Sequence, residues 1–138
     1  MKEFRIGSVG EASETVLHTN TAKAMGSGSL DVYATPAMLA LMEKAACEIV
    51  NPCLDDATTS VGISVNLSHD AATLVGKTVN AKAVLVGVDG RKLTFKITVS
   101  DDYGTIGQGT HERFLVNKEK FLVNKEKFLG KLAAKDQK

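Results

Sequence analysis

One segment constrains the fold of this chain more than any other: the run Asp31–Leu54, with the sequence DVYATPAMLALMEKAACEIVNPCL. After Asp55 the chain changes to the two-residue alternation of β-strands and keeps it for about sixty residues. A helix this apolar needs a sheet to cover it, so we predict an α+β fold with one long helix against one antiparallel sheet. The apolar residues of the helix recur at three- and four-residue spacing: Met38, Leu39, Met42, Ala45, Ala46 and Ile49.

The dipeptide Thr35-Pro36 predicts where this helix begins. Proline suits the first helical position, because the amide it lacks would be unpaired there, and threonine before it is a natural N-cap. Asn51-Pro52 ends the regular run. Inside the apolar run the helix carries one acidic side chain, Glu43.

Alternating segments separated by short turns predict the strands of the sheet. Asp89-Gly90 is a two-residue turn of the kind that closes a hairpin. The glycine-punctuated segment Thr21–Ser29 is expected to be a flexible loop that either connects two elements or covers a ligand. The expected strands are Ser13–Thr19, Thr59–His69, Thr78–Val88, Leu93–Val99 and Thr105–Val116.

The strand Thr59–His69 alternates most cleanly, so we expect one of its faces to pack on the helix. By this parity His69 points toward the helix and Gly62 points away from it. The predicted inward residues are Val61, Ile63, Val65, Leu67 and His69, and the predicted outward residues are Gly62, Ser64, Asn66 and Ser68.

Bulk properties narrow the function class. A chain of 138 residues is expected to form one domain, residues 1–138. Its 17 basic and 16 acidic residues argue against a nucleic-acid-binding protein. The apolar runs are shorter than the ~20 residues that span a bilayer, and the N-terminus lacks the apolar core of a signal peptide. We therefore expect a cytoplasmic protein without nucleic-acid or membrane partners, whose Cys47 and Cys53 are reduced thiols.

The sequence FLVNKEK occurs twice in tandem, as Phe114–Lys120 and Phe121–Lys127. The C-terminal tail, residues 117–138, begins within the first copy and includes all of the second. Seven residues make two helical turns, so the duplication keeps Phe121 and Phe128 in phase on one helix face. We expect a short C-terminal helix with a solvated, lysine-rich face and assign it no chemistry.

A single helix covers only one face of a sheet and leaves the sheet edges open. A second copy of the chain is the simplest cover, so we expect at least a homodimer, with a dimer of dimers as the larger alternative.

Three residues are candidates for chemistry, and each has a structural alternative. Glu43, amid apolar neighbours, can serve as a base or nucleophile, or it can point to solvent. His69 is either a proton carrier facing the helix or a satisfied core histidine. Thr35 is either a catalytic hydroxyl or a simple N-cap. The spacing of the histidines does not support a metal site, and we expect none.

These candidates raise a geometric difficulty. Thr35 and Glu43 are eight residues apart, which is about 12 Å on a straight helix, so they do not both reach one reacting carbon. Either Thr35 lies in a loop that folds back, or the site is built from two chains across a dimer interface. The residues leave both alternatives open.

Four runs taken together resemble the hotdog-fold acyl-CoA thioesterases, and most closely the fluoroacetyl-CoA thioesterase subfamily. The likeness extends from about Val9 to Lys120 and depends on the order of the runs, since each one alone is weakly specific. The runs are Ala34–Ala46, Thr58–Gly76, Val88–Asp102 and Ile106–Val116.

The resemblance implies a long helix wrapped by a curved antiparallel sheet, with active sites at the seam between subunits. In that subfamily a Thr, a Glu and a His cooperate in thioester hydrolysis, and Thr35, Glu43 and His69 match them. Gly62 matches a glycine close to the thioester carbonyl. Arg113 matches an arginine expected to aid coenzyme A binding or site electrostatics. Coenzyme A enters as part of the substrate, and no other cofactor is implied.

The resemblance also assigns provisional roles. Glu43 attacks the carbonyl or activates water, His69 carries the proton, and Thr35 orients or attacks. A backbone N–H near Gly62 or at the helix start stabilises the developing oxyanion.

One departure limits the resemblance. The segment Met25–Ser29 has no aromatic residue to close an entrance, so we expect a short or medium acyl group rather than the fluoroacetyl preference. The alternatives to a thioesterase are a non-catalytic module that binds acyl-CoA or another small ligand, and a dehydratase-like hotdog enzyme.

Overall fold

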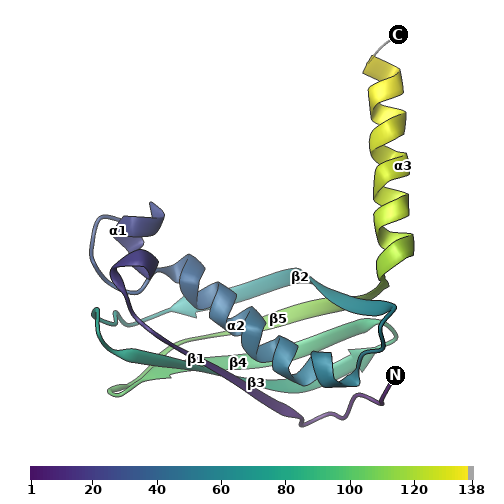
Figure 1. Cartoon of the computed structure of the whole chain (residues 1–138). Helices are drawn as coiled ribbons and strands as arrows, with labels where there is room; N and C mark the ends of the chain where they lie inside the picture. The colour runs from purple at the N-terminus through teal and green to yellow at the C-terminus, as the bar shows by residue number, and fades with distance from the viewer. Residues whose placement is uncertain (137–138) are drawn as a thin grey trace.

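The computed structural model describes residues 1–136 and shows one long helix, α2, lying across a curved antiparallel sheet (Figure 1). The strand order is β1-β3-β4-β5-β2, with every neighbouring pair antiparallel. The strands are β1 Val9–Thr15, β2 Thr58–His69, β3 Thr78–Asp89, β4 Lys92–Asp101 and β5 Gly104–Asn117. The helices are α1 Ala22–Met25, α2 Thr35–Val50 and α3 Lys118–Asp136, with short 3-10 turns at His18–Asn20 and Asn51–Cys53. The predicted α+β hotdog architecture is confirmed.

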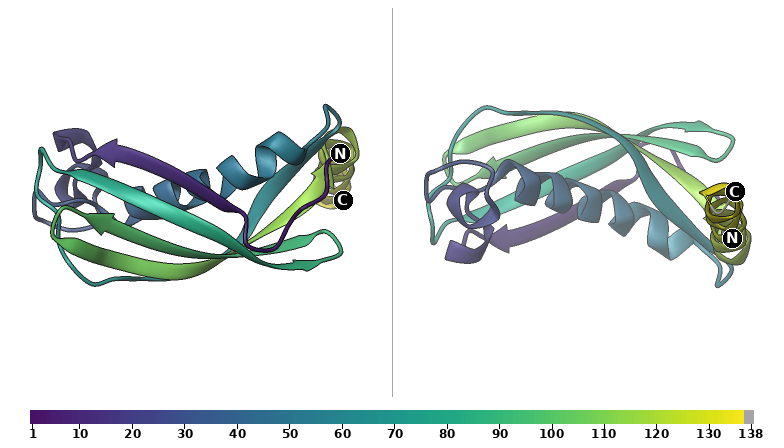
Figure 2. Two further views of the ribbon diagram at one scale, coloured as in Figure 1. Left: turned by 90° about the horizontal axis from the view of Figure 1, so that it is seen from below. Right: turned by 90° about the horizontal axis from the view of Figure 1, so that it is seen from above.

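The core lies between α2 and the concave face of the sheet, which curls around the helix in both views of Figure 2. The buried helical residues lie on one face at helical spacing: Ala37, Met38, Leu41, Met42, Ala45, Ala46, Ile49 and Val50. The convex face carries exposed polar residues such as Lys96, Thr98 and Gln108, so it needs no second apolar layer. The sheet edges, rather than this face, are what another chain would cover.

The first strand lies four residues earlier than predicted. β1 spans Val9–Thr15, and His18 stands beyond it in a 3-10 turn instead of sharing a strand face with Val16. The reason is close packing against α2: a Cβ at Gly10 would lie 2.4 Å from the Ala45 carbonyl oxygen. Because only glycine and alanine fit where β1 meets the helix, the strand lacks the large apolar residues that usually reveal one.

The segment expected to be a flexible loop, Thr21–Ser29, is partly helical. The Thr21 hydroxyl accepts a hydrogen bond from the Ala24 amide and caps the short helix α1, which ends at Gly26 in a left-handed conformation (φ 72°). The prediction of a structureless connector was therefore wrong for Ala22–Met25.

The start of α2 also differs from the prediction by one residue. Ala34 is the N-cap, with extended backbone angles and no side-chain cap, and Thr35 is already helical. The predicted capping role of Thr35 was wrong, and its hydroxyl is used elsewhere. The C-terminal boundary at Asn51-Pro52 is confirmed.

A β-bulge reverses the alternation of β2. Gly62 pairs with Arg113 and Ser64 pairs with Glu112, so Ile63 is an extra residue that bulges outward with 52% of its surface exposed. The parity predicted from alternation holds for Val65–His69 but fails before the bulge. Gly62 therefore faces the helix, on the same face as His69.

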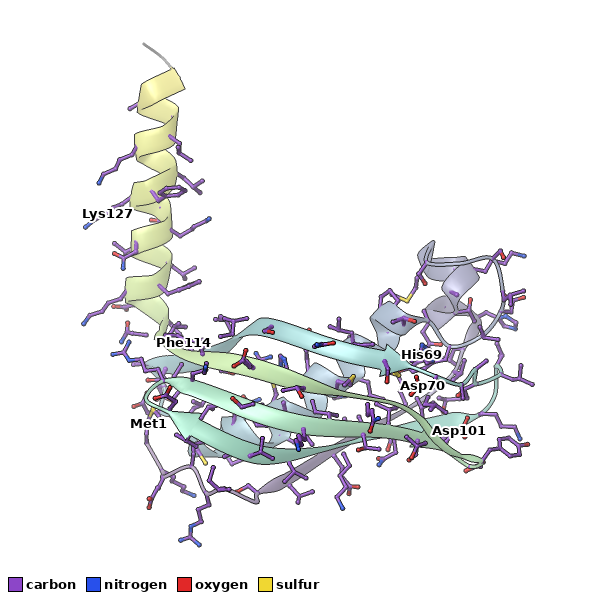
Figure 3. All side chains as sticks on the ribbon, turned by 180° about the vertical axis from the view of Figure 1, so that it is seen from behind. Met1, His69, Asp70, Asp101, Phe114 and Lys127 are labelled. Atoms are coloured by element: carbon purple, nitrogen blue, oxygen red, sulfur yellow. The ribbon has the colours of Figure 1, made fainter. Side chains whose placement is uncertain are left out.

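The tail forms the predicted helix, which rises away from the sheet (Figures 1 and 3). The two copies of the repeat differ in structure. Residues 114–117 of the first copy are the last four residues of β5, whereas the same four residues of the second copy, 121–124, are helical. Figure 3 shows Phe114 on the sheet and Lys127 on the helix.

Candidate functional site

Two polar clusters lie along helix α2, and the first joins its start to the end of β2. The Thr35 hydroxyl lies 2.7 Å from His69 Nδ1. Thr35 reaches the histidine because it is the first residue of the helix and His69 is the last residue of β2, on the helix-facing side. The structure thus joins two of the three predicted catalytic residues.

His69 is held in a defined orientation. Its ring stands edge-on to Tyr33, with centroids 6.4 Å apart and planes at 77°. The hydroxyl of Tyr33 donates a short hydrogen bond to Glu14, and burial together with that carboxylate raises the Tyr33 pKa. The tyrosine therefore stays neutral and forms a firm side wall for the imidazole.

The second ring nitrogen of His69 is buried without a hydrogen bond in the described part of the chain. Its Nε2 is inaccessible to solvent and has no hydrogen-bond partner within residues 1–136. Burial lowers the pKa of His69, against smaller opposing effects of the Ala71 backbone and Asp70. A neutral histidine at physiological pH can accept a proton, which a base in hydrolysis requires.

A cleft of about 210 Å³ opens beside this pair. It lies between the segment after α1, the start of α2 and the chain just after β2, and its lining includes Ser27, Tyr33, Thr35, His69 and Asp70. Figure 3 shows His69 and Asp70 at the end of the sheet remote from α3.

The second cluster is centred on Glu43, in the middle of α2. Arg113 NH1 donates to Glu43 Oε2 at 3.2 Å, and only 9% of the arginine side chain is exposed. Arg113 lies on β5, and its guanidinium group is held by Ser60 on β2. Its Nε donates to the Ser60 hydroxyl at 2.8 Å, and its NH2 donates to the Ser60 carbonyl at 3.1 Å. The alternative that Glu43 points freely into solvent is therefore wrong, although 36% of its side chain remains exposed.

Gly62 makes room for this carboxylate. A Cβ at Gly62 would lie 2.7 Å from Glu43 Oε2, 3.3 Å from His111 and 3.4 Å from Arg113 NH1. The resemblance placed Gly62 near a substrate carbonyl. In this chain it lies under the catalytic candidate Glu43, because the bulge turns it inward.

His111 is a member of the second cluster that sequence reasoning did not select. It is completely buried, and its Nε2 lies 3.2 Å from Arg113 NH1. The alternation of β5 could have found it, since His111 and Arg113 are two residues apart and so share the inward face.

The two clusters do not meet within one chain. Thr35 is the first residue of α2, so it does not lie in a loop that folds back toward Glu43, and the helix separates them by about 12 Å. Along β2, His69 lies about 20 Å from Gly62, the residue that packs against Glu43. Of the two alternatives left by the sequence, the loop that folds back is therefore wrong.

Three further properties of the described residues concern metal binding, membrane spanning and the state of the cysteines. Within residues 1–136, no three His, Cys, Asp or Glu side chains gather in a way that could hold a metal ion. In the same part of the chain, no helix has the length and apolar character needed to cross a bilayer. Cys47 and Cys53 are free thiols, both half-buried.

Comparison with known proteins gives consistent results. The family model for fluoroacetyl-CoA-specific thioesterase matches residues 16–119. A curated fluoroacetyl-CoA thioesterase from Streptantibioticus cattleyicolor is 40% identical over 89 residues, which cover 64% of this chain and 64% of that protein.

Solved structures extend this likeness over more of the chain. The fluoroacetyl-CoA thioesterase FlK superposes with a TM-score of 0.84 at 30% identity, covering 91% of this chain and 98% of FlK. A threonine-to-serine variant of FlK in complex with acetyl-CoA superposes with a TM-score of 0.83 at 31% identity, covering 89% of this chain and 97% of that one. With the family model spanning most of the residues, the chain belongs to the fluoroacetyl-CoA-specific thioesterase family.

Proposed function

We propose that this protein hydrolyses acyl-CoA thioesters to a free acid and coenzyme A, at two equivalent sites shared between the subunits of a homodimer. Family membership supports the reaction class. The observation that carries the shared site is the separation of the two clusters, because Thr35, which contacts His69, and Glu43, which contacts Arg113, lie about 12 Å apart along α2. One reacting carbonyl does not reach both clusters of a single chain, so the second set of groups would come from the partner subunit.

Strand β2 supplies a way to bring the two clusters together. It lies at an edge of the sheet, where its outer backbone groups can pair with another strand. An antiparallel pairing of β2 with its copy, centred on Asn66 with Ile63 left as the bulged residue, sets His69 opposite Gly62 of the partner subunit. Opposed residues share a face, so His69 and Glu43 of the partner subunit then lie over the same crevice.

The flank of α2 around Glu43 fits such an interface. Leu39 and Cys47 lie one helical turn before and after Glu43, and both are half-buried in the single chain. Burying these apolar surfaces against the partner would exclude water from the carboxylate, which strengthens its electrostatic interactions.

The proposed chemistry needs only groups that these two clusters provide. The Glu43 carboxylate either attacks the thioester carbonyl, which expels the thiolate and forms an anhydride that water then hydrolyses, or it takes a proton from a water molecule as that water attacks the carbonyl. Neutral His69 receives the proton that the water gives up and passes it to the thiolate. The Thr35 hydroxyl fixes the imidazole through Nδ1, at 2.7 Å. In the first turn of α2, where Pro36 has no amide and the Met38 amide bonds the Ala34 carbonyl, the amides of Thr35 and Ala37 are the ones left to stabilise the oxyanion.

The substrate is proposed to carry a short acyl group. The cleft beside His69, at about 210 Å³, is below the roughly 300–1,000 Å³ typical of sites for larger ligands. Of the segment Met25–Ser29, only Ser27 reaches the lining, and the aromatic residue of the wall, Tyr33, lies beyond that segment with its hydroxyl bonded to Glu14. We therefore expect acetyl-CoA and other short acyl-CoA esters to be hydrolysed without a strong preference for fluoroacetyl-CoA.

Subunit complementation tests the reaction and the shared site together. Glu43→Gln and His69→Ala proteins, each inactive alone, are mixed under conditions that exchange subunits, and thiol release from acetyl-CoA is measured. Random exchange makes half of the dimers mixed, and each mixed dimer has one intact site, so about a quarter of wild-type activity should return.

The outcomes separate the alternatives. Failure to restore activity, in a mixture shown to contain mixed dimers, would contradict the shared site. A wild-type protein that binds acyl-CoA without releasing thiol would instead be a binding module, and loss of water from a 3-hydroxyacyl thioester would indicate a dehydratase-like enzyme.

A further inference from the structure

His111 stands out among the buried groups that the proposed chemistry does not use. It has no exposed surface, and its ring stacks on Phe95 with centroids 6.1 Å apart and planes at 30°. Histidine is rarely buried so completely unless both ring nitrogens are satisfied.

The contacts of the ring define its protonation state. Arg113 can only donate, so the contact of 3.2 Å between Arg113 NH1 and His111 Nε2 requires a lone pair on Nε2. The proton must then reside on Nδ1, which donates to the Ser64 carbonyl at 2.9 Å. The imidazole is therefore neutral and fixed as one tautomer.

Each of these two contacts acts on the Glu43 cluster. The bond to Ser64 holds β2 on the C-terminal side of the bulge that turns Gly62 inward under the carboxylate. The bond to Arg113 fixes the NH1 group that also donates to Glu43 at 3.2 Å. With Ser60 bound to Nε and NH2, the guanidinium has a partner on each of its three nitrogens.

We infer that His111 is a positioning residue, which holds Arg113 on Glu43 by accepting a hydrogen bond and stabilises the bulge that accommodates the carboxylate. This role rests on the proposed function for its catalytic consequence. Glu43 touches the reacting atoms, and His111 acts on it only through Arg113 and Gly62.

The charges around the ring explain why it must remain neutral. Arg113 and Glu112 on β5 and Glu43 on α2 are the charged groups that act on it. Burial is the largest effect and lowers the His111 pKa, and the Ser64 hydrogen bond, the next in size, opposes it. The Arg113 cation lowers the pKa further, against smaller opposing effects of the two carboxylates. Protonation would remove the acceptor and set two cations 3.2 Å apart.

Two substitutions separate the two hydrogen bonds. In His111→Gln the side-chain amide reaches the position of Nε2, and its oxygen can accept a hydrogen bond from Arg113. In His111→Asn the shorter side chain reaches only the position of Nδ1, so its NH2 group can donate to the Ser64 carbonyl but nothing accepts from Arg113. We expect His111→Asn to lower kcat about tenfold or more with little change in KM, and His111→Gln to retain most of kcat. His18→Gln, at an exposed histidine that belongs to neither cluster, is the matched control.

Nitrogen NMR of the free protein supplies a readout that does not depend on turnover. The wild type should show His111 protonated on Nδ1 alone, and slow rotation of the Arg113 guanidinium. The slow rotation should persist in His111→Gln and disappear in His111→Asn.

The results distinguish failure of this inference from failure of the proposed function. An Nε2-protonated His111, a freely rotating Arg113 in the wild type, or kcat in His111→Asn equal to or above that of His111→Gln would overturn the positioning role. If the wild type releases no thiol from any acyl-CoA while the NMR results are as expected, the proposed function fails and the hydrogen-bond geometry is upheld.

Discussion

The two polar clusters on α2 differ in how completely they are satisfied. In the Glu43 cluster, Arg113 donates to a carboxylate, a hydroxyl and a carbonyl, and His111 uses both ring nitrogens. In the Thr35–His69 cluster one hydrogen bond is made, and His69 Nε2 has no partner in the chain as described. One cluster is a fully hydrogen-bonded support for a carboxylate, and the other keeps a ring nitrogen without a partner within the described residues.

This difference keeps the carboxylate and the imidazole of one chain apart. Within one chain, helix α2 keeps Thr35 and Glu43 about 12 Å apart, so Glu43 pairs with Arg113 rather than with His69. Assembly is what would bring the base and the carboxylate together.

Glu43→Gln should reduce thiol release from acetyl-CoA by about a thousandfold or more, because it removes the base or nucleophile and leaves a near-isosteric group on Arg113. Steady-state kinetics measures the effect. Glu48→Gln, at an exposed position on the same helix, is the control and should retain wild-type rates. Similar kinetics for the two variants would contradict the assignment of Glu43.

Gly62→Ala should reduce kcat about tenfold or more, because the added Cβ would lie 2.7 Å from Glu43 Oε2 and displace the carboxylate. The obstacle is the end of a side chain that can move, so thermal stability should fall less than activity.

Gly109→Ala offers the matched comparison for this substitution. There the added Cβ would lie 2.5 Å from the Asn66 carbonyl oxygen and 2.9 Å from Leu67 Cα, which are backbone atoms that cannot yield locally. Melting temperatures should therefore fall further in Gly109→Ala than in Gly62→Ala. The reverse order would show that Gly62 serves the sheet and not the carboxylate.

Thr35→Val should lower kcat up to about tenfold, because it removes the single hydrogen bond that orients His69 while keeping the shape of the side chain. Thr35→Ser keeps the hydroxyl and should remain near wild type in the same assay. If Thr35→Val instead abolishes turnover, Thr35 is a nucleophile and not an orienting group.

Stability should decrease moderately as the pH falls below about 6.5, the ordinary pKa of histidine. Burial lowers the folded-state pKa of both His69 and His111. The unfolded chain therefore binds more protons than the folded chain in this range, so the free energy of unfolding decreases as the pH decreases. The loss continues until the pH passes below the folded-state pKa values.

Denaturant titrations at pH 7.5 and 5.5 measure this effect. The difference between the two pH values should shrink in His111→Gln, which cannot titrate. An unchanged difference in that variant would assign the pH dependence to other groups.

Much of the fold and half of the site could be predicted from the sequence. The apolar period of α2 and the alternation of β3, β4 and β5 are strong local signals, because burial on one face imposes them directly. His69 was correctly assigned to the inward face by parity. By contrast, β1 was misplaced because its close contact with α2 admits only small side chains, and the inward turn of Gly62 depends on a bulge without a clear sequence signal.

Local patterns along the chain therefore set which segments bury a face and which residue types are available for chemistry. Which of these residues meet depends on contacts between distant segments, and the tandem repeat shows why. The same four residues, FLVN, form strand at 114–117, where β4 and β2 supply hydrogen-bonding partners, and helix at 121–124, beyond the ends of those strands. Local preference is weak compared with the gain from pairing and burial, so identical residues adopt the structure that their surroundings can satisfy.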